Sequence, residues 1–191
     1  MSRDLLRGDD VRELVREAYG SVAGTRGDVA ARLYAPEELE LVPQSAVEHA
    51  LGVGNHLRHA RLSEGDTVLD LGAGAGIDTI LAAHRIGSQG RAIALDFLPE
   101  MLERTRAAAS AAGLANVETL EGEIEAIPLP DASVDAVVSN GVINLAPRKS
   151  RVLAECARVL RDGGEFCVSD LTVDEEELPP EVLTHPATWA G

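Results

Sequence analysis

The chain has 191 residues, of which 45% are hydrophobic and 26% are charged, proportions that are ordinary for one soluble globular domain with a buried core. Its 32 acidic and 17 basic side chains give a formal net charge of −15, and so acidic a surface repels nucleic-acid phosphates. The sequence contains no membrane-length apolar run and no signal-peptide core near its start. We therefore expect a cytoplasmic protein without nucleic-acid or membrane partners. The sequence predicts no particular oligomeric state.

Residues 1–66 are predicted to form a helical N-terminal segment that packs on the core of the same single domain. Asp9 and Asp10 can cap a helix whose apolar face carries Val11, Leu14 and Val15. Shorter helical pieces are expected at 30–33, 36–41 and 45–51, and a glycine-rich turn follows at 52–55.

From residue 67 onward, patterns typical of strands and helices alternate. Strands are predicted at 67–71, 92–96, 117–121, 136–139 and 165–170. Helices are predicted between them at 77–86, 99–112 and 148–160, with a looped link at 123–134. This alternation predicts an α/β fold for residues 67–191, with a doubly wound, mostly parallel, Rossmann-like sheet.

The most informative motif is the glycine-rich turn after the first predicted strand, with glycines at positions 72, 74 and 76. Gly72 permits a tight turn, Gly74 lets a ligand approach the backbone, and Gly76 lets the next helix begin close to the sheet. Asp70, just before this turn, disfavours a dinucleotide pyrophosphate and favours a ligand with sulfonium and ammonium groups. The motif therefore predicts a site for S-adenosylmethionine (SAM), with Asp70 orienting the turn and offsetting positive charge.

Further candidate ligand-binding residues follow the other strands, whose carboxyl ends meet at one edge of such a sheet. Asp96 can accept hydrogen bonds from both ribose hydroxyls. Glu123 can accept one from the adenine amino group, while Ile124 packs on the ring, and backbone groups at Gly72 and Gly74 hold the amino-acid part. The predicted cofactor-binding residues are Asp70, Gly72, Ala73, Gly74, Asp96, Phe97, Met101, Gly122, Glu123, Ile124 and Asn140.

The remaining reactive side chains favour structural roles. His56 and His59 could share a helix face, but no third ligand is obvious, so no metal site is predicted. Cys156 and Cys167 fit an apolar helix face and a strand interior, as small core residues. No dedicated general base stands out, and catalytic residues stay unassigned. The candidates for the reacting end of the cleft are Asn55, Asn140 and Asn144.

From about residue 34 to residue 191, the chain resembles the arsenite methyltransferases, a group of SAM-dependent methyltransferases. The segments that carry the resemblance are 68–74, 96–102, 122–128, 139–145 and 158–164. The Ser-Asn-Gly-Val-Ile-Asn-Leu segment at 139–145 and the ending at 185–191 are the more particular to this family. The resemblance implies SAM as the cofactor and a small-molecule acceptor, a soft nucleophile such as arsenite.

The chain departs from this family at the positions that the resemblance assigns to arsenic-binding cysteines. Val53 and Gly141 occupy two of these positions, and a third would follow Gly191. Neither side chain can replace a soft thiolate ligand. Only five strands are expected, without the closing antiparallel hairpin of this type of enzyme, so the C-terminal part is expected to be incomplete. Three functions stay open: an arsenite-type methyltransferase, a methyltransferase for another small organic molecule, and a non-catalytic SAM-binding protein.

Overall fold

The fold is a five-stranded parallel sheet, seen in a computed structural model that describes residues 13, 15–17 and 27–172. The strands are β1 (Thr67–Leu71), β2 (Arg91–Asp96), β3 (Val117–Glu121), β4 (Val134–Asn140) and β5 (Leu160–Ser169). Their spatial order is β3-β2-β1-β4-β5, and every neighbouring pair is parallel. The predicted doubly wound α/β fold is therefore confirmed.

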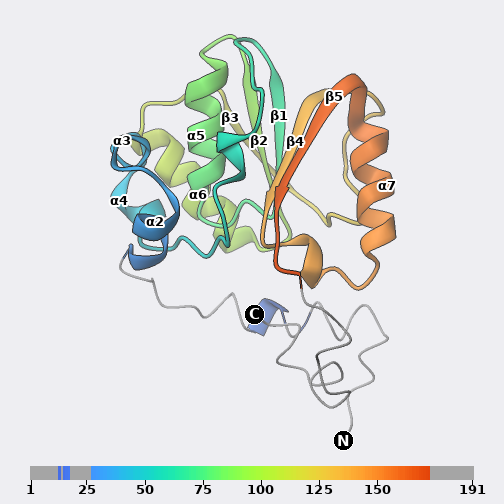
Figure 1. The fold of residues 1–191 in the computed structure, drawn as a ribbon, viewed down its shortest axis with the longest axis horizontal. Helices are drawn as coiled ribbons and strands as arrows, with labels where there is room; N and C mark the ends of the chain where they lie inside the picture. Colours follow the sequence, from blue (N-terminus) through green and yellow to red (C-terminus); the bar gives the residue numbers. More distant parts are fainter. Residues whose placement is uncertain (1–12, 14, 18–26, 173–191) are drawn as a thin grey trace, which may run out of the picture.

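The connecting helices lie on both faces of the sheet. α5 (Ile77–Ile86) and α6 (Pro99–Ala111) cover one face, and α7 (Lys149–Val159) covers the other (Figure 1). Pro99 occupies the start of α6, where its fixed φ suits a helix and its missing N–H leaves no bond unmade.

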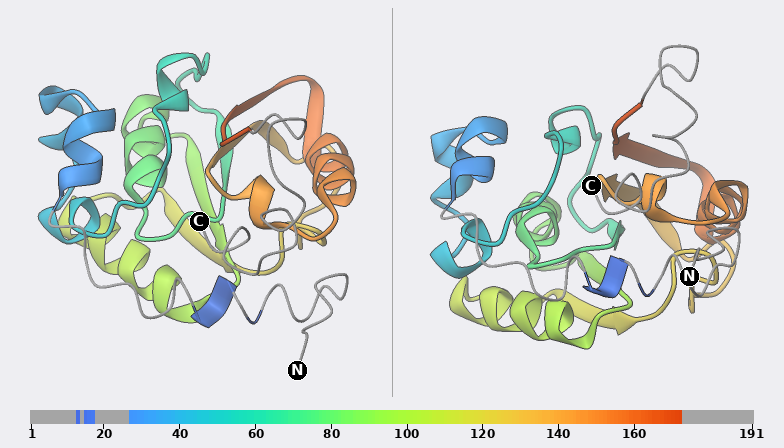
Figure 2. Two further views of the ribbon diagram at one scale, coloured as in Figure 1. Left: turned by 60° about the horizontal axis from the view of Figure 1, so that its bottom comes forward. Right: turned by 90° about the horizontal axis from the view of Figure 1, so that it is seen from below.

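Short helices before β1 pack against the α5 side of the sheet. They are α2 (Asp28–Leu33), α3 (Pro36–Leu39), α4 (Gln44–Val47) and the 3₁₀ helix η1 (His56–Arg58). Their buried apolar side chains join one core with those of α5, among them Ala30, Tyr34, Val47 and Leu57. Residues 13 and 15–17 are also helical, and Figure 2 shows them beside the carboxyl ends of the strands. The other residues of this predicted first helix lie outside the described part of the chain.

Alternate residues of each strand face two different hydrophobic cores. Val68 joins the core on the α5 side, whereas Leu69 and Leu71 join the core on the α7 side. This period of two follows from the pleat of a strand. By the same period, Asp70 and Asp96 lie on the α5 side of β1 and β2, near the carboxyl ends of these strands.

Some predicted boundaries were wrong. β5 begins five residues earlier than expected, because the strand continues through an irregularity at residues 161–164, where Gly163 has a φ of +79° and the pairing shifts from Leu160 with Val134 to Glu165 with Ala136. β4 is correspondingly longer than the expected 136–139. The helix expected at 45–51 begins at Gln44 and ends at Val47, and turns at residues 48–49 follow it.

Truncating a central core side chain should test this packing. Leu69 is 0% exposed in β1, so Leu69→Ala should lower the free energy of unfolding by about 2–5 kcal/mol through lost burial and a cavity. Urea denaturation measures the change. The matched control is Leu153→Ala on α7, where the side chain is 48% exposed and the loss should stay within about 0.5 kcal/mol. Equal losses would contradict the assignment of Leu69 to the core.

Candidate active site

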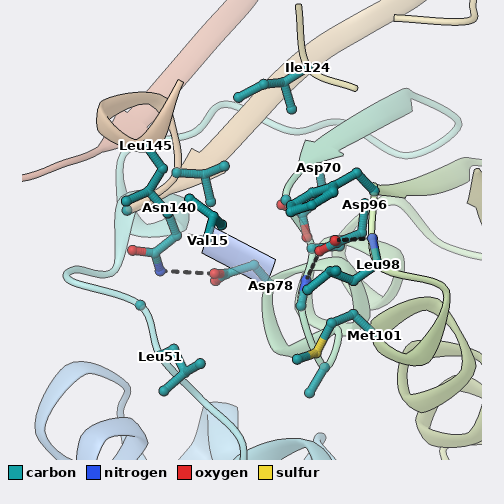
Figure 3. Close-up of a pocket in the computed structure, with 18 of the residues that line it drawn as sticks. Val15, Leu51, Asp70, Asp78, Asp96, Leu98, Met101, Ile124, Asn140 and Leu145 are labelled. Carbon is teal, nitrogen blue, oxygen red and sulfur yellow. Dashed lines mark hydrogen bonds between the residues drawn. The ribbon is translucent and has the colours of Figure 1, made fainter. Parts of the chain in front are cut away.

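A cleft opens at the carboxyl end of the sheet, next to β1 (Figure 3). β1 lies between β2 and β4, so the strand order switches direction here. This switch in strand order is where doubly wound sheets bind their ligands. All eleven predicted cofactor-binding residues line the cleft. Of the three asparagines proposed for the reacting end, Asn140 lines it, whereas Asn55 and Asn144 are not among the described residues that do.

The glycine-rich loop gives the cleft a bare backbone wall. Gly74 has a φ of +55°, and a Cβ built on it would meet nothing within 4 Å, so open space lies beside its backbone. Gly76 has a φ of +88°, and a Cβ there would lie 2.8 Å from the Thr105 side chain. Glycine at position 76 therefore leaves room for Thr105 of α6, in addition to its predicted role at the start of α5.

Asp96 ends β2 with its carboxylate held at the cleft wall. Its Oδ2 accepts a hydrogen bond from the Gly74 N–H over 3.0 Å, and its Oδ1 accepts one from the Leu98 N–H over 3.0 Å. Burial raises the pKa of this carboxyl group, while the backbone donors at Leu98 and Gly74 lower it. Phe97 adds a third backbone hydrogen bond to this group, and because a carboxylate has about four acceptor sites, these donors do not fill all of them.

Two further carboxyl groups are buried next to the glycine-rich loop. Thr79 Oγ1 donates to Asp70 Oδ2 over 2.6 Å, and Tyr34 Oη donates to Asp78 Oδ1 over 2.8 Å. Burial raises the pKa of both acids, and the nearby charge of Asp78 raises that of Asp70 further. Sequence reasoning missed Asp78, although an acid in the first turn of a helix that follows a glycine-rich loop is a readable signal.

The side-chain amide of Asn140 is committed to protein partners. Its Oδ1 accepts from the N–H groups of Val53 at 2.8 Å and Gly54 at 3.2 Å. Its Nδ2 lies 2.9 Å from Gly54 O, 2.9 Å from Asp78 Oδ2 and 3.1 Å from Tyr34 Oη. Asn140 therefore ties the end of β4 to the segment before η1 and to α5, and it offers a ligand no free donor.

Charge and polarity differ between the two sides of the cleft. Acids line one side, and no described lining residue is Lys or Arg. Apolar side chains line the other, with Val15, Leu51 and Leu145 lying opposite Asp96 and Met101 (Figure 3). Such a cleft favours a ligand with a cationic part beside the acids and an uncharged partner beside the apolar wall.

Neither cysteine of the chain lines this cleft. Cys156 lies on the buried face of α7, as predicted, and burial raises its pKa to about 12. Cys167 is only half-buried, less than predicted, and its Sγ donates to the His56 carbonyl over 3.2 Å. Val53 and Gly141 are close neighbours, since a Cβ at position 141 would lie 3.2 Å from Val53 Cγ1.

The described residues were also searched for other kinds of site. They contain no group of three or more His, Cys, Asp or Glu side chains suited to a metal ion. Within the same residues, no helix is both long and apolar enough to traverse a lipid bilayer.

The buried acids should make the stability of the ligand-free protein depend on pH. Burial raises the pKa of Asp70, so the folded state holds a proton that the unfolded chain has released, and stability falls as pH rises through this window. Asp70→Asn removes the effect without changing shape. Urea denaturation at pH 5 and pH 8 should show a smaller loss for the variant than for the wild type. Parallel losses would contradict a raised pKa at Asp70.

Comparison with known protein families gives a match that covers all five strands of the described sheet. The model of the family described as "Methyltransferase domain" matches residues 62–190. The chain is 37% identical to the arsenite methyltransferase of Halobacterium salinarum over 207 aligned residues, which cover 96% of this chain and 52% of that protein. The chain thus spans about half the length of curated relatives that it matches.

Solved structures agree with this match. An arsenic(III) S-adenosylmethionine methyltransferase from Chlamydomonas reinhardtii is similar with a TM-score of 0.65 and 35% identity, over 92% of this chain and 54% of that one. A SAM-dependent methyltransferase from Aquifex aeolicus is similar with a TM-score of 0.59 and 26% identity, over 91% and 78%. The cofactor of such enzymes is SAM, as the glycine-rich motif predicts. The chain belongs to the methyltransferase-domain family, and its sequence resembles the arsenite methyltransferases within it.

Proposed function

We propose that this chain serves the transfer of a methyl group from SAM to a small-molecule acceptor. The observation that carries the proposal is the Asp96 carboxylate, fixed by the N–H groups of Gly74 and Leu98 next to open backbone at Gly74. An acceptor-only group in this place suits a ribose diol, which presents two hydroxyl donors.

The chemistry of the other lining residues also fits SAM. A ligand with sulfonium and ammonium charges suits the side of the cleft where Asp70 and Asp78 are buried without a cationic side chain among the described lining residues. Ile124 and Met101 offer apolar contacts for an adenine ring, with Glu123 as an acceptor for its amino group. When bound, SAM supplies an electrophilic methyl group on a positively charged sulfur.

The chain itself binds SAM and the acceptor, aligns them with each other and excludes water. The apolar wall at Leu51 and Leu145 suits an uncharged acceptor and keeps water from its contact surface. Asn140 has no free donor or base function, because protein groups take its amide. An acceptor that reacts with little help in losing a proton fits this arrangement best, and the acids disfavour an anionic one.

Resemblance favours arsenite as the acceptor, and one observation favours another small organic molecule. Trivalent arsenic binds strongly where thiolates converge, but Cys156 and Cys167 both lie away from the cleft. A SAM-binding protein without catalysis is the third proposal. The acidic composition supports the absence of a nucleic-acid partner, and a cytoplasmic location is part of the same proposal. The short helices α2, α3 and α4, which pack on the core, support residues 1–66 as a helical segment of the same domain.

Turnover of labelled SAM over a panel of acceptors, with arsenite plus thiols among them, should separate these three functions. We expect methyl transfer to at least one acceptor. Absence of transfer to every acceptor by the longest natural form would favour binding without catalysis. Transfer to arsenite alone separates the first function from the second.

Removing the Asp96 carboxylate should weaken SAM binding. We expect Asp96→Ala to make the free energy of SAM binding about 1.5–3 kcal/mol less favourable, the range for hydrogen bonds to a charged group. Isothermal titration calorimetry measures it. The matched control is Asp162→Ala, which makes the same change of charge at an exposed residue of β5 and should leave the affinity unchanged. A folded Asp96→Ala variant with wild-type affinity would remove Asp96 from the ribose role.

The unmodified chain should not bind arsenite tightly, because no thiol lines its cleft. Val53→Cys together with Gly141→Cys should increase binding, since the two positions are in contact, although the φ of +74° at position 141 strains any residue with a Cβ. Arsenite retention after gel filtration, with arsenic quantified, measures it. Stoichiometric retention by the unmodified chain would contradict the placement of its two thiols.

A further inference from the structure

One side chain joins three segments that are far apart in the sequence. From the end of β4, the Asn140 amide bonds to the backbone of residues 53–54, to Asp78 at the start of α5 and to Tyr34 after α2. Figure 3 shows its bond to Asp78 across the floor of the cleft. The cofactor side and the acceptor side of the cleft therefore meet at this amide.

The segment that Asn140 holds has little room to move. A Cβ at Gly52 would lie 2.7 Å from Asn140 Cγ, and a Cβ at Gly54 would lie 2.8 Å from Ser169 Cβ. Two glycines thus let residues 52–54 pass directly against the ends of β4 and β5. Leu51 and Gly52 line the cleft, so the position of this segment shapes the acceptor side.

We propose that Asn140 is a positioning residue that fixes the acceptor-side wall, residues 51–54, relative to Asp78 on the cofactor side. The proposal rests on the proposed function, because it assigns those two sides to acceptor and SAM. Its consequence is that a change in the ionisation of Asp78 also changes how firmly the backbone of residues 53–54 is held.

The role needs a neutral donor at position 140. Asp78 already faces ionisable groups from several elements: Tyr34, Glu38 on α3, His56 on η1 and Asp70 on β1. A carboxylate at position 140 would stand about 2.9 Å from Asp78 Oδ2, where the amide nitrogen now donates. Two carboxyl groups at so short a distance resist being ionised together. The group at position 140 and Asp78 would therefore share a proton at low pH and repel each other at high pH.

Asn140→Asp is therefore the informative variant, because it keeps the shape and the Oδ1 acceptor while it loses the donors. We expect its SAM affinity, measured by calorimetry, to fall at least about tenfold more than that of the wild type between pH 6 and pH 8. Hydrogen exchange at the Val53 and Gly54 amides should accelerate over the same range, after correction for intrinsic rates.

A matched control separates positioning from general stability. Asn116 Nδ2 also ties a loop, donating to Ala83 O over 3.1 Å and to Gly87 O over 2.9 Å, but it is not among the residues that line the cleft. Asn116→Asp should lower thermal stability while its SAM affinity follows the wild-type pH profile. Identical profiles for Asn140→Asp and the wild type would overturn the proposal.

Gly52→Ala tests the same contact without new charge, should Asn140→Asp fail to fold. The added methyl group overlaps the Asn140 amide, so exchange at the Val53 and Gly54 amides should accelerate at every pH. Unchanged exchange in this variant would also overturn the proposal. A wild-type chain that binds no SAM would instead refute the proposed function.

Discussion

The burial of three carboxyl groups at one edge of the sheet is the constraint on which the site depends. Asp70, Asp78 and Asp96 are all buried, and their hydrogen-bond donors are a hydroxyl, a phenol, an amide and backbone N–H groups. Neutral donors satisfy the oxygens but do not offset a negative charge, so ionising these buried acids is costly without a cationic partner, and burial raises their pKa. A cationic ligand removes this cost, so SAM should stabilise the fold as it binds.

The topology explains why these acids meet. Parallel strands bring their carboxyl ends to one edge, so Asp70 and Asp96 become neighbours through the pairing of β1 with β2. The turn after β1 then starts α5 at the same edge, and Asp78 in its first turn benefits from the positive end of the helix dipole. The N–H of Gly74 closes the arrangement by donating to Asp96, which ties the turn to the neighbouring strand.

The sequence predicted what depends on local pattern and missed what depends on distant contacts. The bounds of β1, β3 and α5 could be read from alternation, and eleven of the residues that line the cleft from the ends of predicted strands. The partners of Asn140 could not, since its bonds to Asp78 and to residues 53–54 join positions 62 and 86–87 apart.

The two sides of the cleft are specified by different physical properties. The cofactor side is specified by charge and fixed hydrogen bonds, which leave little freedom to change a residue without losing the ligand. The acceptor side is specified by shape, for example by the Val53 side chain, which fills the space that a side chain at position 141 would need. Shape can change by single substitutions that leave the buried acids in place. Under the proposed assignment, such a chain can therefore keep its SAM side while its acceptor side comes to fit a different molecule, provided that Asn140 still holds residues 51–54 against Asp78.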